Sequence, residues 1–201
     1  MLQSRSAWSA TTILLAAAWT FAPSRAFAQF GGSDHGELSA RGGIAFGGGS
    51  GGIGAQPLVA GSAGAAFSRY AMVLLDTSYM PLGQHTIQGW PARETVDRSH
   101  LLDFAIDFHI RIPIKERMAP YAIVGAGLLW NMVRQNTSGA AGIPVTNHYD
   151  QFNGALHTGG GLRYYVGENW GFRPEVKVMV SKQVYTCVSF GVFYVVPAFW
   201  P

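Results

Sequence analysis

Charged residues are scarce in this chain. They account for 12% of its 201 residues, whereas an ordinary soluble domain contains about 25%. A soluble domain with so little charge would have difficulty covering its surface with polar groups, but a protein that exposes much of its surface to lipid would not. The net charge is +3 and the basic residues form no cluster, which argues against a nucleic-acid partner.

Disulfide and metal-binding patterns are absent as well. Cys187 is the single cysteine, so it forms no internal disulfide and is most simply a small packed side chain. The GxGxxG pattern at Gly47, Gly49 and Gly52 is not followed by an expected helix, so it does not predict a phosphate site. We therefore expect no cofactor and no metal site. The histidines without metal-ligand spacing are His85, His100, His109, His148 and His157.

The N-terminus carries the pattern of a secretory signal peptide. Arg5 precedes an apolar run from Thr12 to Ala22, which is shorter than the roughly 20 residues that a membrane-spanning helix needs. The small-residue motif that ends at Ala28 predicts cleavage before Gln29. We predict a signal peptide over residues 1–28 and one mature domain over residues 29–201, with a retained anchor as the alternative.

The segment Leu101 to Ile114, LLDFAIDFHIRIPI, alternates between large apolar residues and polar or small ones. Such alternation is typical of a β-strand whose two faces meet different surroundings. Later apolar runs such as Tyr121 to Trp130 are about ten residues long, which is the length of a tilted transmembrane strand. Since open strand edges cannot exist in lipid, strands that cross a membrane must close into a barrel.

Eight segments follow this pattern, separated by residues that favour turns. They are Glu37–Phe46, Leu58–Phe67, Ala71–Met80, His100–Ile112, Pro120–Val133, Gln151–Val166, Trp170–Lys182 and Tyr185–Val196. Long loops at Phe46–Pro57, Pro81–Arg98 and Arg134–Asp150 alternate with short turns, as in outer-membrane barrels. We predict an all-β fold, a closed antiparallel up-and-down transmembrane β-barrel of eight strands. Pro174 predicts an irregularity in its ladder because proline lacks the N–H donor.

Polar groups of both signs occupy one face of the predicted strands. On a soluble sheet they would form a solvated outer face, but in a charge-poor secreted chain we expect them to fill a narrow lumen. An unpaired buried charge costs several kcal/mol, so these groups are expected to form an ion-pair network that plugs the lumen. A secreted, soluble calycin-like ligand carrier, with an apolar lumen, is an alternative. The predicted network residues are Glu37, Arg41, Asp76, Asp103, Asp107, His109, Arg111, His157, Arg163, Arg173, Glu175 and Lys177.

Aromatic residues near the predicted strand ends are expected to form the belts found at membrane interfaces. They are Trp90, Trp130, Tyr149, Trp170, Tyr185, Tyr194 and Trp200.

Three segments, APYAIVGAGLLW, GALHTGGGLRYYVGENWGFRPEVKV and VSFGVFYVV, resemble the small outer-membrane barrels of Gram-negative bacteria, akin to outer membrane proteins A and X. The resemblance spans Glu37 to Val196 and rests on pattern. It implies a location in the outer membrane, contact with its lipids and lipopolysaccharide, and insertion by the barrel assembly machinery. That machinery reads a terminal aromatic residue, whereas here Trp200 precedes Pro201. The implied role is structural or in surface interaction, with at most a narrow pore and an extracellular ligand at the loops.

A lipid A-modifying enzyme is the other alternative, because some barrels of this kind use a His–Ser pair near the external rim. The segment Asn147–Asn153 resembles that pattern, but Asp150 stands where the serine nucleophile would be. Ser99 and His100 are adjacent and would point to opposite faces of a strand. We therefore expect no catalytic residues.

Overall fold

Eight strands make up the described part of the chain. The computed structural model describes residues 35–48, 54–89, 93–112, 114, 117–138 and 144–196. The predicted signal peptide, with its cleavage site between Ala28 and Gln29, lies outside these residues. The strands are β1 (His35–Gly48), β2 (Gln56–Ser68), β3 (Ala71–Gly89), β4 (Arg93–Arg111), β5 (Met118–Ser138), β6 (Pro144–Tyr165), β7 (Trp170–Val180) and β8 (Val184–Val196).

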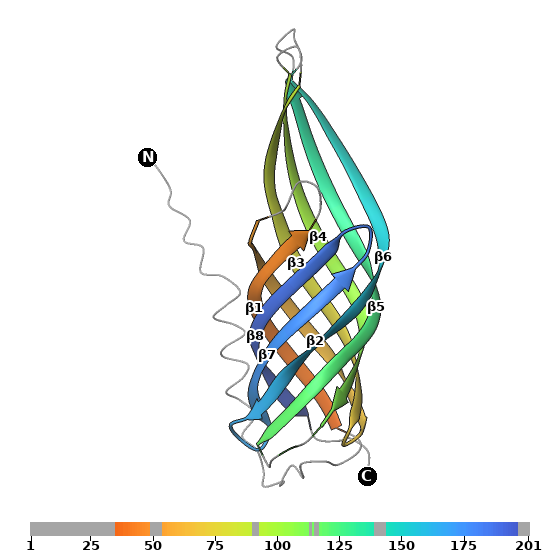
Figure 1. Ribbon diagram of the computed structural model, residues 1–201, viewed down its shortest axis with the longest axis vertical. Helices are drawn as coiled ribbons and strands as arrows, with labels where there is room; N and C mark the ends of the chain where they lie inside the picture. The colour runs from red at the N-terminus through yellow and green to blue at the C-terminus, as the bar shows by residue number, and fades with distance from the viewer. Residues whose placement is uncertain are drawn as a thin grey trace, which may run out of the picture.

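The strands close into one barrel. Each strand pairs antiparallel with its neighbour in the chain, and β1 pairs with β8 from Gly36–Val196 to Gly48–Val184. Figure 1 shows the strands running obliquely around a common axis. The predicted fold class, a closed up-and-down barrel of eight strands, is confirmed. Within the described ranges, no helix is long and apolar enough to cross a membrane.

The alternation in β4 separates an apolar outside from a charged inside. Ile106 and Ile110 are 59% and 46% exposed, whereas Asp103 and Asp107 are at most 1% exposed. Large apolar side chains of the other strands, such as Leu156 of β6, are exposed in the same way. The outer surface is therefore the apolar one, which suits lipid and is the reverse of a soluble barrel.

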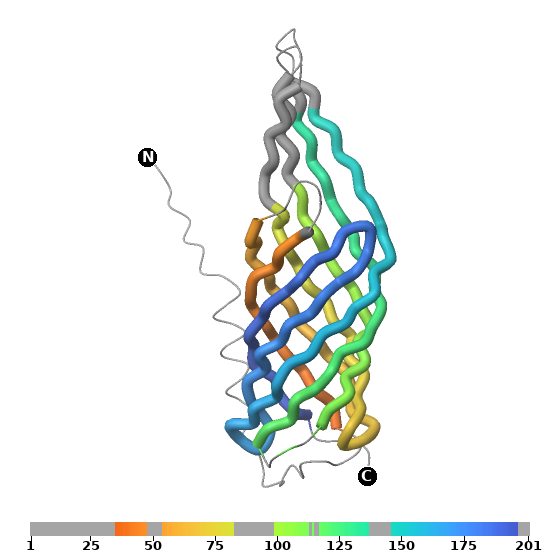
Figure 2. Tube along the Cα trace, viewed as in Figure 1, coloured from red at the N-terminus to blue at the C-terminus, as the bar shows by residue number. Residues whose placement is uncertain are grey.

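The prediction of long loops at Pro81–Arg98 and Arg134–Asp150 is wrong, because both segments are mostly strand. β5 and β6 contain 21 and 22 residues, about twice the number that a tilted strand needs to cross lipid. Residues 84–89, 93–99, 132–138 and 144–151 of β3 to β6 pair into a four-stranded extension, here called the projecting sheet. Figures 1 and 2 show β5 and β6 continuing well past the β7–β8 turn.

The projecting sheet escaped prediction because it lacks a contrast between its faces. Residues 146–152 of β6 are all exposed, so neither face of this segment packs against an interior. An alternating pattern arises only where one face is apolar. Backbone pairing extends these strands, joined by a side-chain hydrogen bond from Thr146 Oγ1 to Asn136 Oδ1 at 2.8 Å.

Prolines interrupt the ladders at two places. Pairing between β6 and β7 passes from Gly161–Glu175 to Tyr164–Phe172, so two positions beside Pro174 are unpaired without a change of register. The irregularity predicted at Pro174 is therefore a gap rather than a bulge. Between β3 and β4 the register shifts after Pro81, at the base of the projecting sheet.

Candidate functional site in the barrel lumen and at its mouth

The structure places every residue of the predicted lumen network inside the barrel. All twelve are buried, with exposures of 5% or less. They come from five strands, β1, β3, β4, β6 and β7, so they meet only because the barrel closes. Ten of them are connected by ion pairs into one cluster. His109 and Arg111 form no ion pair within it, and their contacts are described below.

Glu37 of β1 is held by two arginines. Arg163 of β6 donates from Nε and Nη2 to the two carboxylate oxygens at 3.1 and 3.0 Å. Arg173 of β7 donates from Nη1 to Glu37 Oε1 at 3.0 Å. Two-pronged guanidinium–carboxylate pairs of this kind are among the strongest charge-assisted hydrogen bonds. Glu37 thus joins β1 to β6 and β7 across the lumen.

Arg41 of β1 lies between two further carboxylates. Its Nη2 donates to Asp76 of β3 and its Nη1 donates to Glu175 of β7. The second oxygen of Glu175 accepts a 2.7 Å hydrogen bond from Tyr121 Oη. Each acidic group in this layer therefore has at least one donor, as burial requires.

Lys177 of β7 lies among three aspartates. Its Nζ is 3.1 Å from Asp76, 3.3 Å from Asp107 and 3.7 Å from Asp103. His157 of β6 lies between two of them, with Nδ1 3.1 Å from Asp107 and Nε2 3.4 Å from Asp103. Both ring nitrogens therefore face carboxylate oxygens. A doubly protonated ring fits this position, and its charge balances the fifth carboxylate of the cluster.

The two remaining predicted residues behave differently. His109 stacks on Tyr121, with ring centroids 4.8 Å apart, and its Nδ1 lies 3.3 Å from Arg163 Nη2. Since arginine only donates, this imidazole nitrogen accepts. Arg111 lies toward the end with the short turns, where its Nη2 donates to the carbonyl oxygen of Ser68 at 2.8 Å.

Inward-facing glycines make room for the cluster. A Cβ on Gly125 of β5 would collide with Asp107 Oδ1, and one on Gly191 of β8 would collide with Arg41 Cγ. A Cβ on Gly161 of β6 would collide with Tyr121 Oη. The glycine content of the chain thus serves the packing of long polar side chains in a narrow lumen.

An apolar layer closes the lumen between the ion-pair cluster and the end that carries the projecting sheet. The sequence analysis did not predict this layer. Its signal is a change from charged to apolar residues at inward positions: Met179 follows Lys177 in β7, and Leu101 precedes Asp103 in β4. Cys187 packs here as predicted, with its Sγ 4.0 Å from Met80 Sδ. The layer consists of Ala45, Leu58, Met80, Leu82, Leu101, Leu129, Ala155, Met179, Tyr185 and Cys187.

The same layer corrects one aromatic assignment. Tyr185 was expected at the membrane interface but is 5% exposed and faces the lumen. Trp130 does lie on the outer face, where it stacks on Phe152 with ring centroids 5.5 Å apart. Trp170 and Tyr194 are exposed partners near the opposite end of the barrel, and Tyr149 is exposed on β6. Trp90 and Trp200 lie outside the described residues.

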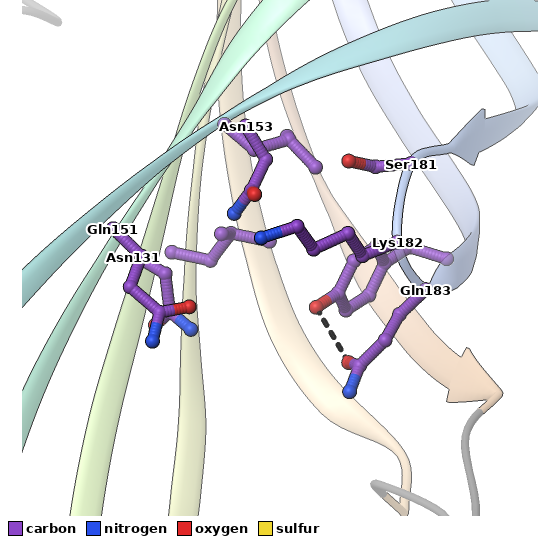
Figure 3. A pocket seen from close by; sticks show the side chains of 9 residues that line it. Asn131, Gln151, Asn153, Ser181, Lys182 and Gln183 are labelled. Atoms are coloured by element: carbon purple, nitrogen blue, oxygen red, sulfur yellow. Dashed lines mark hydrogen bonds between the residues drawn. The ribbon is translucent and has the colours of Figure 1, made fainter.

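A small cavity opens above the apolar layer, at the end here called the mouth. Its volume is about 110 Å³, and it lies between β4, β5, β6 and the β7–β8 turn. Figure 3 shows side chains of Asn131, Gln151 and Asn153 facing Lys182 and Gln183 across it. Within the described part of the chain, no group of His, Cys, Asp or Glu could hold a metal ion.

A closed antiparallel barrel with an apolar outer surface and a charged interior is the architecture of an integral outer-membrane protein. The chain belongs to the outer membrane protein beta-barrel domain family, which matches residues 12–193. It is accordingly a protein of the Gram-negative outer membrane, and the soluble-carrier alternative is wrong. No curated protein matches the chain.

Solved structures show the same fold. Ail, the attachment invasion locus protein of Yersinia pestis, is 11% identical with a TM-score of 0.54, and the match covers 82% of this chain and 99% of that chain. Neisserial surface protein A is 15% identical with a TM-score of 0.51, covering 79% and 96%. OprG from Pseudomonas aeruginosa is 15% identical with a TM-score of 0.52, covering 83% and 99%. At such identities these neighbours share the fold alone with this chain.

Proposed function

We propose that this outer-membrane barrel is closed to diffusion and holds the projecting sheet outside the cell, where the sheet contacts extracellular partners. The proposal rests on one observation: the same barrel has a filled lumen and four strands that are longer than a membrane crossing requires. A side-chain cluster and an apolar layer occupy the interior in series. Long external segments and tight periplasmic turns are the arrangement of outer-membrane barrels, so the projecting end faces outward.

The projecting sheet offers exposed backbone as well as exposed side chains. Pairing of β6 with β7 begins at Leu156, and pairing of β3 with β2 ends at Tyr79. Beyond these positions, among the described residues, each outer strand of the sheet has a ladder on one side only. Unpaired strand edges recruit extended segments of other proteins. Ail has been solved in complex with the heparin analogue sucrose octasulfate, which supports the choice of heparin as a first probe.

The experiment compares the full protein with a variant in which short turns replace residues 84–98 and 135–148. Both are expressed with the native signal, and folding is checked by the shift in gel mobility between boiled and unboiled samples. Cells with the full protein are expected to bind heparin-coated beads and to lose the projecting strands to added protease. A folded variant that binds the beads equally well would refute a role for the projecting sheet.

The outer leaflet supplies a second partner in this proposal. On the outer face, Arg134 and His148 are exposed and paired in register, four positions along each strand beyond the stacked Trp130–Phe152 pair. A guanidinium group beyond an aromatic pair suits the phosphates of lipopolysaccharide above its acyl chains. Asp150, on the intervening rung, would be compatible with a bridging cation. Replacing Arg134 and His148 by glutamine is expected to lower the lipopolysaccharide that copurifies with the protein, and unchanged retention would refute this contact.

Two further expectations belong to the same proposal. We propose insertion by the barrel assembly machinery, although Trp200 and Pro201 lie outside the described residues. We also propose that the barrel has no catalytic activity. His148 is exposed on β6, and no hydroxyl among the described residues forms a hydrogen bond with it.

A further inference from the structure

The cavity at the mouth combines an apolar floor with polar walls. Leu101, Leu129 and the ring of Tyr185 form the floor, which belongs to the apolar layer. Asn131, Gln151 and Asn153 supply amides from adjacent positions of β5 and β6, and each amide both donates and accepts. Apolar contact below hydrogen-bonding groups of both kinds suits the face and edge of a sugar ring.

Among the described residues, Lys182 is the one charged side chain that lines the cavity. It extends from the β7–β8 turn into the cavity toward Asn153 (Figure 3). Among the described residues no carboxylate pairs with it, whereas the acidic groups deeper in the lumen are engaged by Lys177, Arg41 and His157. The cavity is therefore biased toward an anionic group.

The turn that carries Lys182 is fixed in place. Ser181 Oγ donates to the carbonyl oxygen of Gly154 at 2.7 Å, which docks the turn on β6. Tyr185 Oη donates to Gln183 Oε1 at 2.9 Å, which leaves the Gln183 amide nitrogen available to a ligand. The cationic side chain and the amide walls thus belong to connected parts of one rigid barrel.

The wall of the cavity also contains a buried acceptor that a ligand could engage. Asn131 Oδ1 is buried and has no hydrogen-bond partner among the described residues. A buried acceptor left without a donor is destabilising, and a hydroxyl group from outside would satisfy it. Asn131 is paired in register with Gln151, so this atom lies beside another amide of the cavity.

We propose that the mouth cavity binds the terminal acidic sugar of an extracellular glycan. The carboxylate pairs with Lys182, and neighbouring hydroxyls bond to Asn131, Gln151 and Asn153. A volume of about 110 Å³ corresponds to about four waters at liquid density. The cavity therefore takes the carboxylate edge of one ring, while the rest of the glycan stays outside. The inference rests on the proposed function only in placing the mouth outside the cell.

The test uses the full mature chain folded in zwitterionic detergent, with side-chain amide resonances of the three wall residues followed by NMR. Methyl glucuronoside is expected to give saturable shifts in the millimolar range, and methyl glucoside is expected to bind about fivefold more weakly, the upper range for an ion pair open to solvent. Lys182→Gln is expected to abolish this preference. Arg69→Gln, which removes the same charge from an exposed turn at the opposite end, is expected to retain it.

Several outcomes would overturn the proposal. Absence of saturable shifts with folded protein would do so, as would an equal loss of preference in both variants. Sodium acetate that reproduces the shifts at the same concentrations would show that a free carboxylate suffices and that no sugar is recognised. Because binding in detergent does not depend on orientation in the cell, these failures are distinguishable from failure of the protease and bead experiments.

Discussion

Removing the Glu37 carboxylate tests the lumen cluster most directly. Glu37 is 1% exposed and accepts three hydrogen bonds of 3.0–3.1 Å from Arg163 and Arg173. Glu37→Gln keeps the shape but leaves two buried guanidinium groups facing a neutral amide. Breaking a buried ion pair from one side costs about 3–5 kcal/mol. Since about 1.4 kcal/mol is a factor of ten, the folding equilibrium should fall by roughly two to three and a half orders of magnitude.

The assay is urea unfolding in detergent or lipid, with the folded fraction read from unboiled gel samples. Glu168→Gln is the matched control, because Glu168 is exposed in the turn between β6 and β7 and undergoes the same chemical change. A Glu37→Gln midpoint equal to that of Glu168→Gln would refute the reasoning. It would mean that water or rearranged side chains compensate the two arginines.

Three other substitutions test separate parts of the structure. Gly125→Ala is expected to destabilise the barrel by about 1–3 kcal/mol in the same urea assay, because the added Cβ collides with Asp107 and the β4 backbone. Gly154→Ala is the control, since nothing lies within 4 Å of its added Cβ. Ile106→Lys places a charge on the lipid face and is expected to cost about 2–4 kcal/mol if that position lies near the bilayer midplane, whereas Ile106→Val should leave the urea midpoint nearly unchanged. His148→Ala is expected to leave the lipid A profile of expressing cells unaltered by mass spectrometry, and a changed profile would favour the enzyme alternative.

The membrane-crossing part of the barrel could be predicted because lipid and lumen impose opposite demands on successive residues. Along β4, that contrast sends Ile106 outward and Asp107 inward, and the period of two makes it readable. In the projecting sheet, residues 146–151 of β6 are exposed on both faces, so residues such as Asn147 and Tyr149 show no period. Their backbone groups pair with the neighbouring strand, but this pairing produces no alternation of apolar and polar residues in the sequence.

The contents of the lumen were only partly predictable. Which residues point inward follows from local alternation, but which of them meet depends on the register between strands and the stagger of the closed barrel. Arg163 and Glu37 are 126 positions apart in the chain. Tyr185 was misplaced because tyrosine suits both a membrane interface and a buried site with a partner for its hydroxyl, here Gln183.

The distribution of lumen charge along the chain has a consequence for assembly. The inward faces of β1 to β4 carry four carboxylates and two arginines, whereas those of β5 to β8 carry three cations and one carboxylate, apart from the histidines. The first half of the sequence therefore has an excess of negative charge on its inward face, and the second half has an excess of positive charge. Neither half can enter lipid alone without exposing this unpaired charge. The two halves are complementary fragments. If the chain is cut in the turn between β4 and β5, the two fragments should reassemble into a barrel, because electrostatic attraction favours pairing with the complementary fragment.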